Sequence, residues 1–376
     1  MKIIGMSFIL AVSVLFMRVD ITYGQQPSLN SEKLIEINKL IEDGWWEDAE
    51  ALLKPLYDSD PQNPEMLFIT GKLQFLNQDY DAAEKLLEKA IELDGNVSDY
   101  YLWLGHTKGL KAQTGGILKA PGRAKACKNN YARAIELDSN SIEARYSALQ
   151  FHMKAPGFVG GDKKIAYAQT GIMAALDSIR GYEARAMLYE NVEKDFPKAE
   201  NELKAAIKAL ANDTTGNLQP YFWYGYFLNR HDRNAEAESV AFAAMAIDST
   251  NIGVYESLGN LYMQQERYDE AIAQYEKAVA IDSTYSMGLY QIGKLLVLAD
   301  KDLVRAESMF HKYLRARSRG WWPDKPAARW RLAQIYDKQG KYDLARAELE
   351  KAQAEGPKHT KKEIEKLLKE VKKKIK

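Results

Sequence analysis

Small residues recur at long, regular intervals along this chain of 376 residues, and this pattern constrains the fold more than any other feature. Intervals of about 20 to 50 residues are typical of repeated supersecondary units, each of which buries its apolar side only against its neighbours. The first column of the pattern runs through Ile37, Gly71, Gly105, Ala148, Ala186, Gly225, Gly259, Gly293 and Ala333. A second column, later in each unit, runs through Leu56, Ala90, Ala134, Met173, Ala206, Ala244, Ala278, Tyr313 and Ala352.

The unit from Val254 to Thr284 shows the spacing most clearly, with large residues alternating with Gly259, Ala271 and Ala278. Small residues let two helices approach closely, and the large residues between them fill the remaining space. This spacing resembles the tetratricopeptide repeat, a helix-turn-helix unit. The resemblance covers about residues 31 to 357. It implies an all-α fold: a tetratricopeptide-type right-handed α-solenoid of about nine helix pairs, spanning residues 25–357, plus a C-terminal capping helix.

The first 24 residues have the order of a signal peptide. Lys2 precedes an apolar run from Ile3 to Met17, and Gly24 is a small residue at a suitable cleavage position. The run is shorter than the roughly 20 residues that a stable spanning helix needs. We therefore expect cleavage near Gly24 and an exported, periplasmic or extracellular protein that is soluble and has no membrane span in its mature chain. An uncleaved anchor is the alternative.

The C-terminal segment, residues 358–376, follows Pro357 and is rich in lysine. Ile364, Leu368 and Val371 fall on one face of a helix in this segment. We expect this helix to cap the open end of the array, because an exposed terminal repeat needs a polar outer face. A basic amphipathic segment that touches an anionic membrane or polymer is the alternative.

Two insertions interrupt consecutive repeats at the same connection, residues 113–123 and residues 154–163, and both contain the sequence Lys-Ala-Pro-Gly. We expect the two loops to lie side by side at one edge. Glycine-rich backbone with nearby lysines can bind an anion, although neither loop has the phosphate-loop pattern. The alternative is that proline and glycine only shape long turns. The loop in the fourth unit is similar to one in some exported bacterial tetratricopeptide proteins. The candidate loop residues are Lys119, Gly122, Lys154, Gly157, Gly160 and Gly161.

Paired tryptophans, Trp321 and Trp322, lie in a third long connection before the ninth unit. Exposed tryptophans can anchor a partner or stack on a sugar. They can equally seal the connection against neighbouring helices. Both interpretations remain open.

In the tetratricopeptide family, the first helix of each pair lines the inner surface, which implies a set of partner-binding positions in this chain. Charged, amide and aromatic side chains mix along them, which suits an extended peptide better than a deep small-molecule pocket. The candidate partner-binding residues are Arg145, Glu183, Phe222, Tyr226, Asn260, Tyr290, Lys294 and Trp330.

The sequence offers little for catalysis or metal binding. Cys127 is the only cysteine, which excludes an internal disulfide and a multi-cysteine zinc site, and its column predicts a buried residue. His106 and His152 lack a third ligand at a suitable spacing. We therefore expect no catalytic residue, no metal and no cofactor. The 52 basic and 52 acidic residues cancel, so the net charge does not favour a nucleic-acid partner.

These observations favour a non-enzymatic scaffold or adaptor in the cell envelope, with a protein or peptide segment on its concave surface. The alternative is a carrier or sensor of a small anion or glycan at the loops of residues 113–123 and 154–163.

Overall fold

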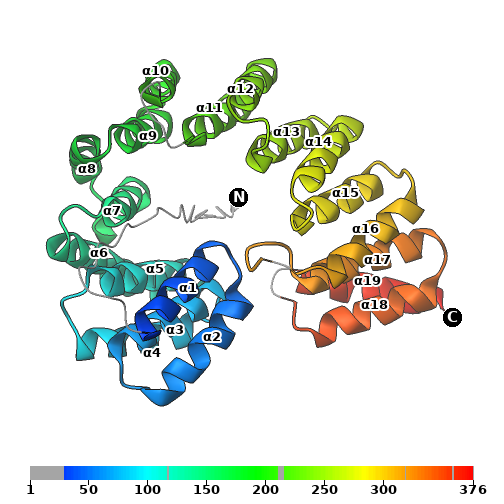
Figure 1. The fold of residues 1–376 in the computed structure, drawn as a ribbon, viewed down its shortest axis with the longest axis horizontal. Helices are drawn as coiled ribbons and strands as arrows, with labels where there is room; N and C mark the ends of the chain where they lie inside the picture. Colours follow the sequence, from blue (N-terminus) through cyan, green and yellow to red (C-terminus); the bar gives the residue numbers. More distant parts are fainter. Residues whose placement is uncertain (1–28, 117, 211–215, 318, 358–359, 376) are drawn as a thin grey trace. The chain divides into compact units, whose positions relative to one another are not determined.

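The computed structural model describes residues 29–116, 118–210, 216–317, 319–357 and 360–375. Within these ranges every regular element is helical, as expected, and nineteen α-helices follow one another along the chain (Figure 1). The predicted signal peptide, residues 1–24, lies outside the described residues. Contacts divide the chain into two units: unit 1 ends at Asp195 and unit 2 begins at Phe196.

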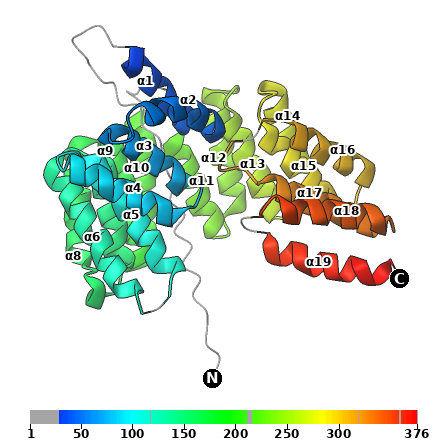
Figure 2. The same cartoon turned by 90° about the horizontal axis from the view of Figure 1, so that it is seen from below.

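Unit 1 contains consecutive helices that pack against their neighbours in the chain (Figure 2). They are α1 (Leu29–Glu42), α2 (Trp46–Ser59), α3 (Pro64–Leu76), α4 (Tyr80–Leu93), α5 (Ser98–Thr114), α6 (Ala120–Leu137), α7 (Ile142–Lys154), the short 3-10 helix η1 (Gly157–Val159), α8 (Lys163–Leu176) and α9 (Ser178–Leu188), followed by a π-helical turn, Tyr189–Glu193.

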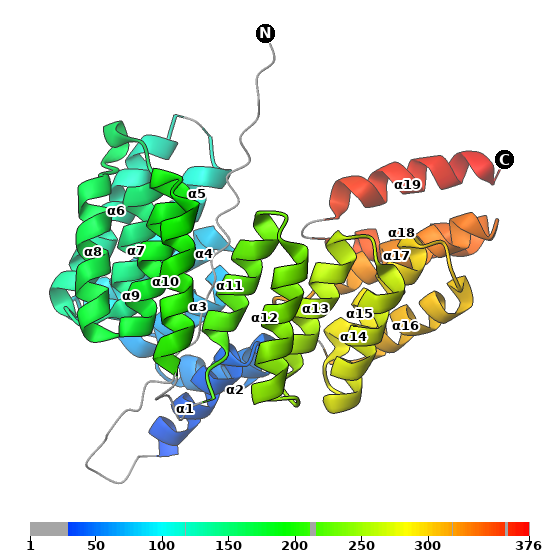
Figure 3. The ribbon, with the colours of Figure 1, turned by 90° about the horizontal axis from the view of Figure 1, so that it is seen from above.

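Within unit 2, too, consecutive helices pack against their neighbours in the chain (Figure 3). It contains α10 (Phe196–Ala209), α11 (Gln219–Arg230), α12 (Asn234–Ile247), α13 (Ile252–Gln264), α14 (Tyr268–Ile281), α15 (Ser286–Leu298), α16 (Leu303–Arg315), α17 (Lys325–Lys338), α18 (Tyr342–Ala354) and α19 (Lys361–Lys374).

Six of the described helix pairs share one tight turn between their two helices. In each turn the chain passes through a residue with positive φ, and the next amide closes the turn onto the first helix. In the α13–α14 turn, for example, Glu266 has a φ of 58° and the Arg267 amide donates to the Tyr262 carbonyl at 2.9 Å. The positive-φ residues of the six turns are Gly44, Gln78, Asp232, Glu266, Asp300 and Gly340. The α5–α6 and α7–α8 pairs have longer connections instead, at the positions of the two predicted insertions.

The predicted packing of small against large residues is confirmed in four of the five glycines of the first column. A Cβ on Gly259 would lie 2.8 Å from the ring of Tyr275, and one on Gly293 would lie 2.9 Å from the ring of Phe310. Gly71 and Gly105 face Leu87 and Tyr131 in the same way. These contacts hold the two helices of each pair close together, and the large partners are buried. Gly225 is different, because a Cβ there would meet nothing within 4 Å.

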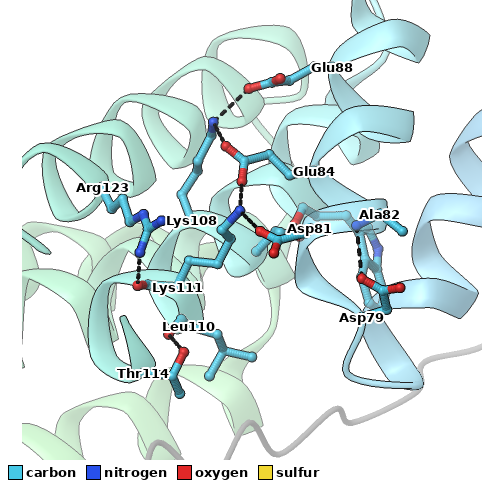
Figure 4. Close-up of polar contacts among 12 residues, drawn as sticks. Asp79, Asp81, Ala82, Glu84, Glu88, Lys108, Leu110, Lys111, Thr114 and Arg123 are labelled. Carbon is cyan, nitrogen blue, oxygen red and sulfur yellow. Dashed lines mark hydrogen bonds and ion pairs between the residues drawn. The ribbon is translucent and has the colours of Figure 1, made fainter. Parts of the chain in front are cut away.

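Ion pairs join α4 to α5 on the surface of unit 1 (Figure 4). Lys108 binds Glu84 and, at 2.6 Å, Glu88, while Lys111 binds Glu84 and Asp81. The Lys111 side chain is only 12% exposed, so its charge requires these partners. The network ties one helix pair to the next by charge as well as by apolar contact.

The C-terminal helix α19 packs against α17 and α18 in unit 2. Its residues Ile364, Leu368 and Val371 are buried and belong to the core cluster that includes Ala345 and Leu349 of α18. Its lysines lie on the other side, as the amphipathic pattern predicts. In the part of the chain that the structure describes, no helix combines the length and apolar character needed to cross a membrane.

Candidate functional site

A shallow hollow, open to solvent, lies on unit 2 between α11, α12 and α13; the space between its walls, open solvent included, is about 410 Å³. In this helix pair two small residues stand where the pairs of Gly71, Gly105, Gly259 and Gly293 place a small residue against a large one. Leu87 and Tyr275 stand sixteen positions after Gly71 and Gly259, but the residue sixteen positions after Gly225 is Ala241. Gly225 and Ala241 both line the hollow. Because α12 has Ala241 at this position, space remains beside Gly225. In the neighbouring pair, α13–α14, the ring of Tyr275 fills the equivalent space beside Gly259.

The walls of the hollow are mainly apolar and aromatic, with amide groups among them. Its lining residues are Tyr221, Phe222, Gly225, Tyr226, Asn229, Ala237, Ala241, Ser257, Asn260 and Leu261. The Tyr275 hydroxyl donates to Oδ1 of Asn260 at 2.8 Å, which fixes this amide and leaves its nitrogen with donors for a ligand. Tyr226 is 44% exposed, and its hydroxyl bonds to Ser257. A partly open aromatic pocket with a few polar groups suits one side chain of a partner.

Charged side chains lie on α13, which lines the hollow, and on α15 and α17, which follow it in the chain. Burial raises the pKa of Glu256 on α13, although Tyr285 and Arg319 partly oppose this. Burial, and then the charge of Arg331, lowers the pKa of Lys294 on α15. The Nζ atom of Lys294 lies 3.5 Å from the sulfur of Met263.

Arg331, on α17, contacts Gln334 at 3.1 Å and Tyr290. In the described ranges, neither Lys294 nor Arg331 forms an ion pair with a carboxylate. Two neighbouring cations without an anion favour a negatively charged group on a partner.

The eight predicted partner-binding residues separate into two groups. Phe222, Tyr226 and Asn260 line the hollow, and Lys294 and Trp330 lie half-buried on α15 and α17 of the same unit. The other three, Arg145, Glu183 and Tyr290, are each less than a tenth exposed.

Those three buried side chains have partners within the fold. Arg145 donates to the Ser139 carbonyl at 2.9 Å and to Gln169 at 2.9 Å. Glu183 pairs with Arg180 at 2.6 Å, and the Tyr290 ring packs on Phe310 with centroids 5.6 Å apart. The sequence spacing therefore placed these three side chains on the expected helices, but neighbouring side chains cover them.

The loop of residues 154–163 is closed by its own hydrogen bonds. The Gly160 amide donates to the Gly157 carbonyl at 2.9 Å, and the Gly161 amide donates to the Pro156 carbonyl at 3.2 Å. A Cβ on Gly161 would overlap the Ala155 carbonyl, so the glycine is required by the turn itself. These two amides are therefore not available to an anion.

The remaining candidate loop residues are exposed. Lys119 precedes α6, and Gly122 lies in the first turn of α6 with no neighbour that a Cβ would touch. Lys154 ends α7, and Gly157 begins η1.

The two tryptophans of the third long connection have different environments. Trp322 is buried against Tyr285, with ring centroids 5.7 Å apart, and the guanidinium of Arg319 lies 5.2 Å from its centroid. Trp321 is 44% exposed. Trp322 therefore seals the connection, which leaves Trp321 as the candidate for contact with a partner. Both lie in unit 2, whereas the two lysine-rich loops belong to unit 1.

The residues considered for chemistry lie in ordinary packing environments of unit 1. Cys127 is buried as predicted, and burial raises the pKa of its thiol to about 12. Burial lowers the pKa of His106 to about 4, and its Nδ1 lies 2.9 Å from the Tyr131 hydroxyl. His152 is buried beside the second loop. Across the described residues, no group of three or more His, Cys, Asp and Glu side chains could hold a metal.

Sequence reasoning did not assign Gly225 and Ala241 to a candidate site, and it did not place Arg331 near Lys294. The sequence contains only part of the signal: Ala241 stands at the spacing after Gly225 that Leu87 and Tyr275 have after Gly71 and Gly259, but Tyr131 and Phe310 follow their glycines at other spacings.

Comparisons with known proteins agree with this architecture. The family model described as "Tetratricopeptide repeat" matches residues 40–104 and 297–368, and that described as "TPR repeat" matches residues 259–298. The fold is a tetratricopeptide-type α-helical solenoid. Curated relatives include Superkiller complex protein 3 of Mus musculus, 23% identical over 243 residues, and that of Homo sapiens, 23% identical over 249 residues. These alignments cover 64% and 65% of this chain but only 15% of each relative.

Similar solved structures include the human IFIT1 dimer with m7Gppp-AAAA, with a TM-score of 0.45 and 16% identity over 92% of this chain and 82% of that one. A tetratricopeptide repeat protein from Parabacteroides merdae has a TM-score of 0.44 and 14% identity over 70% of this chain and 97% of its own. MamA has a TM-score of 0.35 and 21% identity over 46% of this chain and 92% of its own. Proteins of the tetratricopeptide fold generally act as scaffolds for protein–protein interaction.

Proposed function

We propose that this chain is a non-enzymatic scaffold that binds an extended segment of another protein on unit 2. In this proposal, an aromatic or large apolar side chain of the partner enters the hollow. The partner's backbone meets the amides of Asn229 and Asn260 at its rim. Tyr226, exposed at the edge, covers the bound side chain.

The observation that carries this proposal is the pairing of Gly225 with Ala241. A packing pattern that places a ring in the next two helix pairs, α13–α14 and α15–α16, leaves an unfilled, apolar hollow here. Filling such a space with an apolar side chain stabilises a complex by about 1.5–3 kcal/mol for a Leu or Phe. The hollow is thus a position where one apolar partner residue would stabilise the complex.

The charges on α15 and α17 supply a second element of recognition. Lys294 and Arg331 would face an acidic residue of the partner located beyond the side chain in the hollow. Trp330, half-buried on α17, would add apolar contact. This arrangement favours a segment with an apolar residue and a carboxylate separated by the distance between neighbouring repeats.

We place this activity in the cell envelope, on the basis of the signal-peptide order of residues 1–24. Detection of the protein in the periplasmic or secreted fraction, with its N-terminus near Gln25, tests this part by itself.

Selection from a library of random peptides displayed on phage tests the binding proposal. We expect enriched peptides to share one aromatic or large apolar residue near an acidic residue. The variant Ala241→Tyr should lose at least tenfold in affinity for a fluorescein-labelled enriched peptide, because tyrosine occupies the equivalent position 275 in the next pair. That precedent also indicates that the variant folds.

Ala243→Tyr is the matched control, since Ala243 lies on the same helix but is exposed and away from the hollow. It should bind like the wild type. Equal affinity of the wild type and Ala241→Tyr for every enriched peptide would exclude the hollow as the binding site.

A further inference from the structure

The two insertions of unit 1 lie at one edge of the fold. Helices α5, α6 and α7 follow one another with alternating direction, so the α5–α6 and α7–α8 connections are at the same end of these helices (Figure 3). The 3-10 helix η1 of the second connection packs on α6, with Val159 buried and Gly160 against Lys128. We call the residues 115–116, 118–119 and 155–162, together with the adjoining turns of α6 and α8, the loop edge.

Large apolar side chains project from both connections of the loop edge. Leu118 is 98% exposed and Phe158 is 82% exposed, the two highest values among the large hydrophobic residues of the described chain. Each sits at the tip of a connection that is longer than the tight turn of the other pairs. Neither side chain contributes to the packed core, so both are available for contact outside the chain.

The loop edge is also strongly basic, although the whole chain has no net charge. Asp162 is the single acidic residue in the sequence of both segments, 113–128 and 151–164, and it caps α8 by accepting from the Lys164 amide at 2.8 Å. The basic side chains in these two segments, within the loop edge or on the parts of α6 and α7 beside it, are Lys119, Arg123, Lys125, Lys128, Lys154, Lys163 and Lys164.

None of the six lysines forms an ion pair with a described residue. Lys108 and Lys111, on the neighbouring part of α5, differ because Asp81, Glu84 and Glu88 neutralise them (Figure 4). The fold therefore pairs the lysines that face α4 and leaves those of the loop edge without counter-charges.

We propose that the loop edge docks on an anionic lipid membrane, with Leu118 and Phe158 entering the interface and the lysines contacting the headgroups. Exposed apolar side chains surrounded by basic residues are the combination that binds such surfaces. A small soluble anion explains the charge but gives no role to the two apolar tips. In addition, the amides of Gly160 and Gly161 are already bonded within the loop.

Fluorescence at one position of the full chain tests the proposal. Cys127 is buried, so Phe158→Cys provides a single accessible thiol that can be labelled with the environment-sensitive dye NBD. With vesicles of 70% phosphatidylcholine and 30% phosphatidylglycerol, we expect a blue shift and an increase in NBD emission. Vesicles of pure phosphatidylcholine should produce little change. Because the dye reports its own surroundings, binding through residues 1–24 would not produce this signal.

Val304→Cys is the matched control, because Val304 is 75% exposed but lies in unit 2, outside the loop edge. Its NBD emission should not respond. Lys119→Gln, Lys163→Gln and Lys164→Gln combined should weaken binding of the Phe158→Cys reporter about a hundredfold, at roughly fivefold for each lysine.

Three results would overturn the proposal. The dye at position 158 could remain unchanged on the anionic vesicles, or the dye at position 304 could respond equally. Glycerol phosphate alone could produce the full response at position 158 without vesicles, which would identify a small-anion site in place of a membrane surface.

Discussion

Gly259 lies so close to Tyr275 that a Cβ on the glycine would come within 2.8 Å of the tyrosine ring. This contact joins α13 to α14. It is one example of a repeated arrangement in which a small residue on one helix packs against a large residue on the next. Gly225 follows the same sequence pattern without the contact. The two glycines therefore have opposite expected responses to the same substitution.

Gly259→Ala should lower the free energy of unfolding by about 1–3 kcal/mol, because the added methyl group overpacks the contact with Tyr275. Gly225→Ala should raise it by about 0.5–1 kcal/mol, since the methyl group meets open space and alanine is the better helix former. Urea unfolding followed by circular dichroism measures both. Equal changes in the two variants would contradict the packing described for this column.

The ion pairs of Glu84 should make the stability of unit 1 depend on pH. Burial opposes ionisation of Glu84, but hydrogen bonds and charges from Lys108 and Lys111 outweigh it, so its pKa lies below the usual range. A lowered carboxyl pKa stabilises the folded state above the unfolded pKa, about 4.3, and this contribution is lost as the pH falls through the folded pKa.

Glu84→Gln should therefore lower stability at pH 7 by about 1–2 kcal/mol, and the difference from the wild type should shrink below about pH 4. Glu88→Gln is the control, because Glu88 is half-exposed and contacts Lys108 alone. It should cost less than about 0.5 kcal/mol. A Glu84→Gln deficit that stays constant from pH 7 to pH 3 would argue against the ion pairs as its cause.

The thiol of Cys127 should be almost unreactive in the folded protein. It is 3% exposed, burial raises its pKa to about 12, and its sulfur lies against the backbone of Gly109. The thiolate is the reactive form, so labelling requires that the helices open. Reaction with Ellman's reagent at pH 8 should be slow in buffer and complete within minutes in 6 M guanidinium chloride. Rapid labelling in buffer would show that α5 and α6 separate readily.

The last helix should contribute to the stability of unit 2. Ile364 is fully buried against the end of the array, so Ile364→Ala should lower the free energy of unfolding by about 2–4 kcal/mol. Lys366→Ala, on the exposed side of the same helix, should change it by less than about 0.5 kcal/mol. Similar effects of the two substitutions would mean that α19 does not remain packed in solution.

Much of the architecture could be predicted because repeated helix packing requires small residues at regular intervals in the sequence. The glycines at 71, 105, 259 and 293 mark where neighbouring helices approach, and the large residues that face them are buried. The predicted insertions at residues 113–123 and 154–163, within which the α5–α6 and α7–α8 connections lie, were visible as departures from the period. The sequence also showed which face of the last helix would be buried.

The proposed partner surface was only partly predictable. Phe222, Tyr226 and Asn260 were expected to lie on it and line the hollow, whereas Arg145, Glu183 and Tyr290 occupy equivalent positions and are buried. The exposure of such a position depends on the side chains that neighbouring helices bring beside it. A single repeat does not contain that information.

The sequence by itself determined the helix pairs, their order and the columns along which they pack, because these follow from local periodicity and from residue size. Only the tertiary structure decided where packing is left incomplete. Gly225 fits the same sequence pattern as the other glycines of its column. The hollow forms because α12 carries Ala241, and not a ring, at the position that packs on the glycine in the next pair. Empty space is a property of several side chains together, so it is defined only once the helices have met.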